Sequence, residues 1–167
     1  MAACPVFLIF PFAMAFAGAM DLLAFRIPNF VSASLAAGFV LAALILDTGW
    51  STFFIHLVAG LAILIVGFAM FVRGWLGGGD AKLMSAAALW LGFENLPSFL
   101  LWTALLGGGL AIILLSYRRI LPPPWLLRQH WALRLHDPKE GIPYGIALAG
   151  AALIVYPETV WMTGIAG

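Results

Sequence analysis

Apolar runs of about 20 residues recur along this chain of 167 residues and constrain its fold more than any other feature. A helix needs about 20 apolar residues to cross the ~30 Å hydrocarbon layer of a membrane. Hydrophobic residues make up 64% of the chain and charged residues only 9%, whereas a soluble domain carries about 25% charged residues. Because so little polar surface cannot coat a water-soluble globule, the sequence predicts an integral membrane protein.

The apolar segments are expected to be helices, because an open strand would leave backbone groups unsatisfied in lipid. The predicted fold class is all-α, a polytopic membrane protein with about six transmembrane helices in a single domain, residues 1–167. A secretory signal peptide requires basic residues before its apolar run. No Lys or Arg precedes the first run here, so we expect residues 1–25 to be retained. The fourth run is short and is expected to cross only part of the membrane or to continue beside the fifth. The predicted spans are 5–25, 30–47, 52–72, 81–93, 96–117 and 142–161.

The positive charges orient this bundle. All of them fall in or beside the connections between the first and second, third and fourth, and fifth and sixth spans. Positive residues mark the cytoplasmic face of a membrane protein, so both termini are expected outside. The eight residues are Arg26, Arg73, Lys82, Arg118, Arg119, Arg128, Arg134 and Lys139.

The longest connection, residues 122–140, opens with three prolines that would stop the preceding helix. Apolar residues then alternate with Arg128, His130 and Arg134, which is typical of a helix lying in the cytoplasmic membrane interface. A plain basic loop is the alternative.

Asp21 lies inside the first span, near its cytoplasmic end. An ionisable residue in a membrane helix is costly and is a functional candidate by default. The alternative is an ion pair with Arg26, five residues further along the chain.

Asp80 follows three consecutive glycines on the same cytoplasmic side, directly before the fourth span. Two carboxylates that share a site cannot both ionise cheaply, so such a pair holds a single proton. The ionised member can then take a proton from water while the protonated member polarises a scissile carbonyl. Asp21 and Asp80 together therefore predict an aspartyl protease site, although Asp80 could also be only an N-cap for a helix beginning at Ala81.

The glycine stretch, Gly77, Gly78 and Gly79, fits a protease site because residues without a Cβ let a substrate backbone approach closely. A simple turn is the alternative for this stretch. Lys82 is a further candidate that would attract an acidic substrate residue, and its alternative role is that of a positive anchor at the cytoplasmic face.

The sequence lacks the motifs of other hydrolytic and phosphate-binding sites. The sequence has no GxSxG or HExxH motif, and "GGGDAKLMS" lacks the GKS/T ending of a phosphate-binding loop. His56 is expected to be a packed residue rather than a ligand. A single cysteine rules out an internal disulfide framework. We therefore predict no metal site and no cofactor, and no basic tract indicates nucleic-acid binding.

Three motifs together resemble those of a known family. "GGGDAK" (77–82) is similar to the GxGD pattern of intramembrane aspartyl proteases, and "DLLAFRIPN" (21–29) is similar to the prepilin peptidase branch of these enzymes. "IPYG" (142–145), at the start of the last span, resembles a third stretch of that branch. The resemblance implies a GxGD-type helix bundle with Asp21 and Asp80 as the catalytic pair. It also implies that the glycines, Pro143, Tyr144 and Gly145 shape the site.

The implied activity is that of an aspartic endopeptidase in the bacterial cytoplasmic membrane. Such an enzyme removes a short basic leader from prepilins or pseudopilins just before their hydrophobic helix. Larger members of the family carry a cytoplasmic region with paired CxxC cysteines that is associated with N-methylation. This chain instead resembles the short, peptidase-only form of Flp-type (tight-adherence) pilus systems, so no methyltransferase activity is expected.

Two other functions remain open at this point. In a small proton- or cation-coupled transporter, Asp21 and Asp80 would relay protons or bind the cation. A non-enzymatic assembly scaffold is the third possibility. The position of the two acids toward one face favours the protease, because a carrier places its acidic residues near the membrane midplane.

Overall fold

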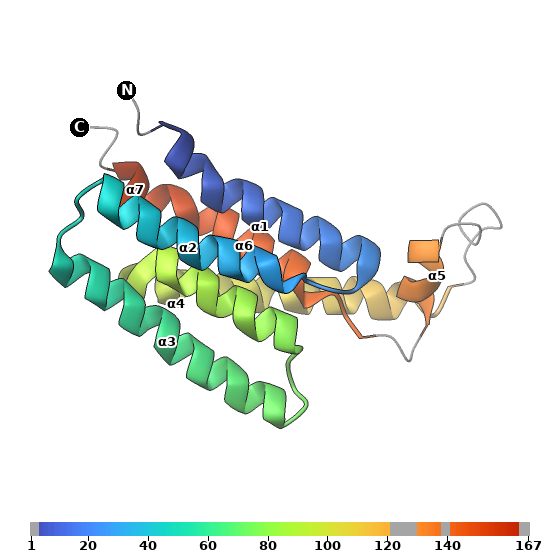
Figure 1. The fold of residues 1–167 in the computed structure, drawn as a ribbon. Helices are drawn as coiled ribbons and strands as arrows, with labels where there is room; N and C mark the ends of the chain where they lie inside the picture. The colour runs from blue at the N-terminus through green and yellow to red at the C-terminus, as the bar shows by residue number, and fades with distance from the viewer. Residues whose placement is uncertain (1–3, 121–129, 138–140, 164–167) are drawn as a thin grey trace.

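The computed structural model describes residues 4–120, 130–137 and 141–163, and the regular elements within these ranges are all helical. Figure 1 shows an elongated bundle in which the start of α1, the α2–α3 connection and α7 lie at one end. The α1–α2 and α3–α4 connections lie toward the other end, as does α5. The elements are α1 (Cys4–Ala24), α2 (Asn29–Ile45), α3 (Trp50–Val72), α4 (Gly78–Tyr117), α5 (His130–His136), α6 (Tyr144–Val155), the 3-10 helix η2 (Tyr156–Glu158) and α7 (Val160–Thr163).

The predicted all-α membrane fold is confirmed. Three helices in the described ranges are long and apolar enough to cross a membrane: residues 6–24 of α1, all of α3, and α4. Two shorter apolar helices, Asn29–Ile45 and Tyr144–Glu158, complete the bundle. The six expected spans therefore correspond to five apolar helices, because the fourth and fifth form the single 40-residue element α4.

α4 is broken at Gly92, whose backbone angles (φ 68°, ψ 175°) are not helical. Essentially only glycine adopts this region of backbone space. A straight 40-residue helix would be about 60 Å long, twice the hydrocarbon thickness. The break instead divides α4 into residues 78–91 and residues 93–117, close to the predicted limits of the fourth and fifth spans.

Three side chains satisfy the carbonyl groups that the break releases. His56 Nδ1 lies 2.8 Å from the Leu89 oxygen. The Trp161 indole N–H donates to Trp90 O at 2.5 Å, and the Asn95 amide donates to Leu91 O at 3.0 Å. Backbone groups left unpaired away from water are costly, so these bonds make the break a stable feature of the fold.

The first half of α4 forms the centre of the bundle, with α3 packed closely against it through two glycines. A Cβ on Gly60 would lie 2.5 Å from the Leu89 side chain, and one on Gly67 would lie 3.2 Å from Ala81 Cβ. Small residues of this kind let membrane helices approach closely. α2 also packs on α4, and α6 packs between α1 and α4.

Two predicted boundaries were wrong. α4 begins at Gly78 rather than Ala81, so two of the three glycines belong to its first turn. The last span was expected to be continuous over 142–161, but α6 ends at Val155 and η2 follows, with Pro157 in it. Proline lacks the N–H that a continuing helix needs. In the predicted interfacial segment 122–140, residues 130–136 form the helix α5, and residues 121–129 and 138–140 lie outside the described ranges.

Candidate active site

Asp21 lies on the last turn of α1 and is buried, with 6% of its surface exposed. α1 ends at Ala24 because the next residue, Phe25, adopts a left-handed conformation (φ 52°), which is a common way for a helix to end. The backbone N–H of Gly145, at the start of α6, donates a 2.6 Å hydrogen bond to Asp21 Oδ2. A Cβ on Gly145 would lie 2.8 Å from the same oxygen, so only glycine leaves room for this contact.

Asp80 lies in the first turn of α4 and is half-buried. The N-cap of this helix is Gly77, so Asp80 does not have the alternative role of an N-cap for a helix beginning at Ala81. The Asp80 carboxylate folds back over the cap, and a Cβ on Gly77 would lie 2.7 Å from Asp80 Oδ2. The glycine at this position therefore leaves the space that the carboxylate occupies.

Asp21 and Asp80 line one cavity of about 590 Å³. Its walls are the end of α1, the connection to α2 and the glycine stretch 77–79. The two carboxylates are close enough to interact electrostatically. Arg26 also lines the cavity, but within the described part of the chain it forms no ion pair with Asp21. The alternative in which Arg26 neutralises Asp21 is therefore not the arrangement found.

The remaining predicted residues of the glycine stretch pack against neighbouring elements. A Cβ on Gly79 would lie 3.3 Å from Ile27 Cβ, and one on Gly78 would lie 3.2 Å from the Phe71 ring. The stretch is thus held between the α1–α2 connection and the end of α3.

Lys82, Pro143 and Tyr144 surround the site at greater distance. Lys82 is exposed, and its ammonium donates a 3.0 Å hydrogen bond to Asn29 Oδ1. Pro143 is the N-cap residue of α6, directly before the turn that meets Asp21. The Tyr144 ring packs on Gly107 of α4, where a Cβ would lie only 2.5 Å from it.

Two residues make contacts at the site that the sequence did not predict. Asn29, the last residue of the "IPN" stretch, lines the cavity as the first residue of α2. Arg134 of α5 donates a 3.2 Å hydrogen bond to the carbonyl of Ala24, another cavity residue. No local pattern reveals the second contact, because 110 residues separate the two partners.

The described residues contain no group of three or more His, Cys, Asp or Glu side chains that could hold a metal ion. His56, predicted to be a packed residue, is buried against Phe39 and Trp161 at the α4 break. Its role there is structural.

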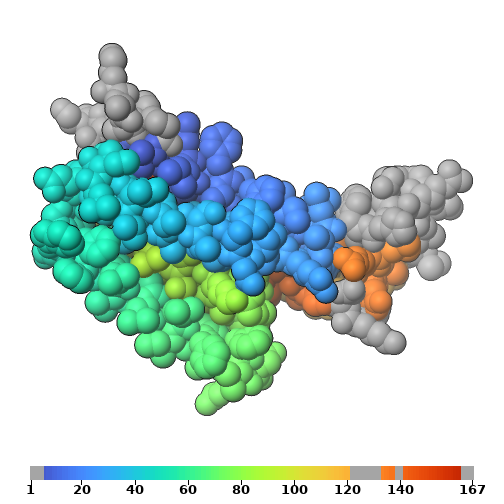
Figure 2. Space-filling model, viewed as in Figure 1, coloured from blue at the N-terminus to red at the C-terminus, as the bar shows by residue number. Residues whose placement is uncertain are grey.

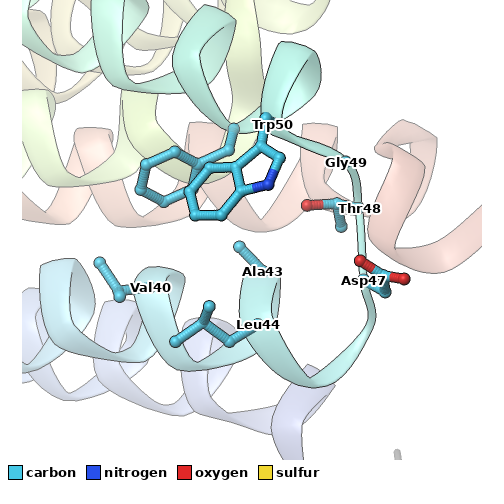
Figure 3. Close-up of a pocket in the computed structure, with 8 residues that line it drawn as sticks. Val40, Ala43, Leu44, Asp47, Thr48, Gly49 and Trp50 are labelled. Carbon is cyan, nitrogen blue, oxygen red and sulfur yellow. The ribbon is translucent and has the colours of Figure 1, made fainter.

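A further cavity of about 270 Å³ lies at the other end of the bundle, between the end of α2 and the start of α3 (Figure 3). Val40, Leu44 and Trp50 supply apolar walls, and Asp47 lies on the connecting loop at its edge. One carboxylate beside an apolar cavity does not provide the paired acid and base that hydrolysis by carboxylates requires.

The two carboxyl groups determine which reactions the Asp21–Asp80 cavity can support. Two neighbouring carboxyl groups can share one proton, so that one accepts a proton while the other donates one. The cavity is large enough for water and a segment of extended chain, and it lies at the end of the bundle where α4 begins (Figure 1).

Residues 8–112, nearly two thirds of the chain, match the model of the type IV leader peptidase family. The matched region contains both carboxylates and the glycine stretch. Comparison with curated proteins gave no match. Comparison with solved structures also gave none.

Proposed function

The chain belongs to the type IV leader peptidase family, and on this premise we propose that it is an aspartic endopeptidase using Asp21 and Asp80. Its substrates are prepilin-type precursors, of the type IV or Flp kind, from which it removes the short leader. The observation that carries the proposal is the shared cavity, in which carboxylates 59 residues apart in sequence face one space.

The reaction uses the two carboxyl groups in complementary roles. The ionised carboxylate takes a proton from water, and the water oxygen attacks the scissile carbonyl carbon. The protonated carboxyl donates its proton toward the carbonyl oxygen, giving a tetrahedral diol. Collapse of the diol breaks the C–N bond. One diol hydroxyl returns its proton to the carboxylate that had donated one, as the carbonyl re-forms, and the proton first taken from water passes to the leaving amine. This reaction requires no metal or organic cofactor, because the two carboxyl groups themselves activate the water and polarise the carbonyl.

The surroundings of each carboxylate support a division of these roles. Asp21 accepts the Gly145 N–H at the N-terminus of α6, where unpaired N–H groups and the helix dipole favour a negative charge. Asp80 also lies at a helix N-terminus, in the first turn of α4, but it shares its cavity with the charge on Asp21, which opposes a second negative charge. We therefore assign the ionised, proton-accepting role to Asp21 and the shared proton to Asp80 in the resting enzyme.

The charge distribution supports a site at the cytoplasmic face of the bacterial inner membrane. Arg26 and Arg73 lie on the connections beside the cavity, and Lys82 lies in the first turns of α4. The α2–α3 connection at the other end carries Asp47 and no basic residue. By the positive-inside rule, the cavity end is cytoplasmic. A leader that remains in the cytoplasm while the rest of the precursor enters the membrane would present its junction at this depth.

A cleavage assay with the purified protein in lipid tests the proposal. The probe is a precursor with a short basic leader followed by an apolar helix of about 20 residues. We expect one bond to be cut, at the junction of leader and helix, as read by mass spectrometry of both products. An uncut precursor, or cleavage that persists when both aspartates are changed to asparagine, would contradict the proposal.

A further inference from the structure

We propose that the groove between α2 and α3, floored by α4, binds the apolar membrane helix of the substrate and so directs its leader junction into the Asp21–Asp80 cavity. This inference rests on the proposed function and adds to it a docking surface. It concerns residues of α2, α3 and α4 outside the carboxylate cavity.

α2 and α3 both pack on α4. They meet each other toward the α2–α3 connection, where Phe39 stacks on Phe53 and His56, and the groove lies between them nearer the start of α2. In Figure 2 the yellow-green surface of α4 is visible between the blue α2 and the green α3. The hollow measures about 290 Å³. Ser32, Ala33 and Ala36 line its α2 side, Ser85 and Ala86 form its floor, and Leu64 lines its α3 side.

The groove is continuous with the carboxylate cavity. Asn29 lines both spaces, and Lys82, which also lines the groove, lies two residues after Asp80. From this end the groove follows α2 for about two turns, toward the opposite side of the membrane. A helix lying in it would therefore have one end at the two carboxylates and its length within the apolar layer.

The lining fits a helix better than a small ligand. Small side chains line the α2 side and the floor of the groove, and the Ser85 hydroxyl is already bonded to Gly60 O at 2.9 Å. Membrane helices associate by close packing across such small residues, since burial of apolar surface gives no driving force within lipid. Ala33 is exposed and Ala86 is buried, so the groove presents a shallow surface open to the side.

A second apolar groove provides the alternative site. It lies between α4 and α6, has a volume of about 380 Å³ and is lined by Leu110, Ile113 and Gly150 among others. It shares no lining residue with the carboxylate cavity. It comes near the site at Ile146, next to Gly145, whereas the α2–α3 groove shares Asn29 with the carboxylate cavity, which is why we assign the α2–α3 groove to the substrate.

Photo-crosslinking distinguishes the two grooves. A photoreactive amino acid is placed at Ala33 or at Gly109 of the Asp80→Asn protein in lipid, with the leader-plus-helix precursor as probe. We expect the Ala33 position to crosslink to the precursor at least tenfold more efficiently than the Gly109 position. Equal yields, a higher yield at Gly109, or no crosslink at Ala33 would overturn the inference.

Cleavage by filled-groove variants gives a second readout. Ala36→Phe fills the groove, whereas Ala37→Phe adds the same ring to an exposed neighbouring position outside it. We expect Ala36→Phe to lower precursor cleavage at least tenfold and Ala37→Phe to change it less than twofold, with both proteins remaining folded by thermal unfolding. Failure of the unsubstituted protein to cleave would contradict the proposed function. Normal cleavage by both variants would contradict only the groove.

Discussion

The backbone N–H of Gly145 donates a 2.6 Å hydrogen bond to Oδ2 of Asp21, across 124 residues of sequence. This bond ties the start of α6 to the last turn of α1 and fixes the orientation of one of the two carboxylates. It also explains why a motif at the far end of the chain belongs to the same site as Asp21.

Gly145→Ala tests this relationship. The new Cβ would lie 2.8 Å from Asp21 Oδ2 and 2.9 Å from Asp21 Cβ, so the carboxylate must move. A displacement of about 1 Å costs on the order of 100-fold in rate. We expect a loss of this size in the cleavage rate constant, measured with saturating precursor. Gly141→Ala is the control, because a Cβ there meets nothing within 4 Å; equal rates for the two variants would contradict the role of Gly145.

Gly77→Ala should act in the same way on Asp80. Its Cβ would lie 2.7 Å from Asp80 Oδ2, whereas a Cβ on Gly78 would meet the ring of Phe71 at 3.2 Å. Phe71 is exposed, and its ring can shift. Cleavage kinetics should therefore show a larger loss for Gly77→Ala than for Gly78→Ala. The reverse order would mean that the glycines serve the packing of α3 rather than the position of Asp80.

The Lys82–Asn29 hydrogen bond predicts coupling between these two residues. It joins α2 to α4 at the boundary between the cavity and the groove. Because both side chains are exposed, each alanine variant should lower the free energy of unfolding by less than about 1 kcal/mol. If the bond positions the site, the Lys82→Ala/Asn29→Ala double variant should cleave no more slowly than the worse single variant. Multiplicative losses would favour an independent role for Lys82, such as attraction of an acidic substrate residue.

Gly92 should control stability without affecting chemistry. Its backbone conformation is restricted to glycine, and a Cβ would lie 2.7 Å from His56 Nε2. Gly92→Ala should therefore destabilise the fold by about 1–3 kcal/mol, measured as a lowered free energy of unfolding in detergent. His56→Ala should cost a similar amount, about 1–3 kcal/mol, because Leu89 O loses its partner. Cleavage per folded molecule should stay near normal, and a specific loss of rate would contradict a purely structural role.

The helix bundle could be predicted from the sequence because a membrane restricts the structures that an apolar segment can adopt. Long apolar runs must be helical, and the one-sided distribution of Arg and Lys is enough to predict that residues 21 and 80 lie at the same end of the bundle. The apolar pattern also predicts a boundary within α4 near residues 93–96. The apolar pattern does not predict that the break occurs at Gly92, because the residues next to a glycine do not determine its backbone angles.

Contacts between segments distant in the chain could not be predicted from the sequence. The predicted start of the fourth helix at Ala81 assumed that glycines stay outside a helix, but packing of Gly78 and Gly79 against Phe71 and Ile27 holds them within the first turn. The meeting of Gly145 with Asp21 likewise depends on how α6 packs on α1. Local preferences carry no information about either contact.

The most direct measurement of the central claim is the cleavage rate of Asp21→Asn, Asp80→Asn and the double variant, with insertion and folding verified for each. If the two carboxylates act as one unit, each single variant should lose about 10²- to 10⁴-fold in rate, and the double variant should lose little more. Near-normal cleavage by either single variant, or a double loss equal to the product of the single losses, would contradict the claim that Asp21 and Asp80 form one catalytic pair.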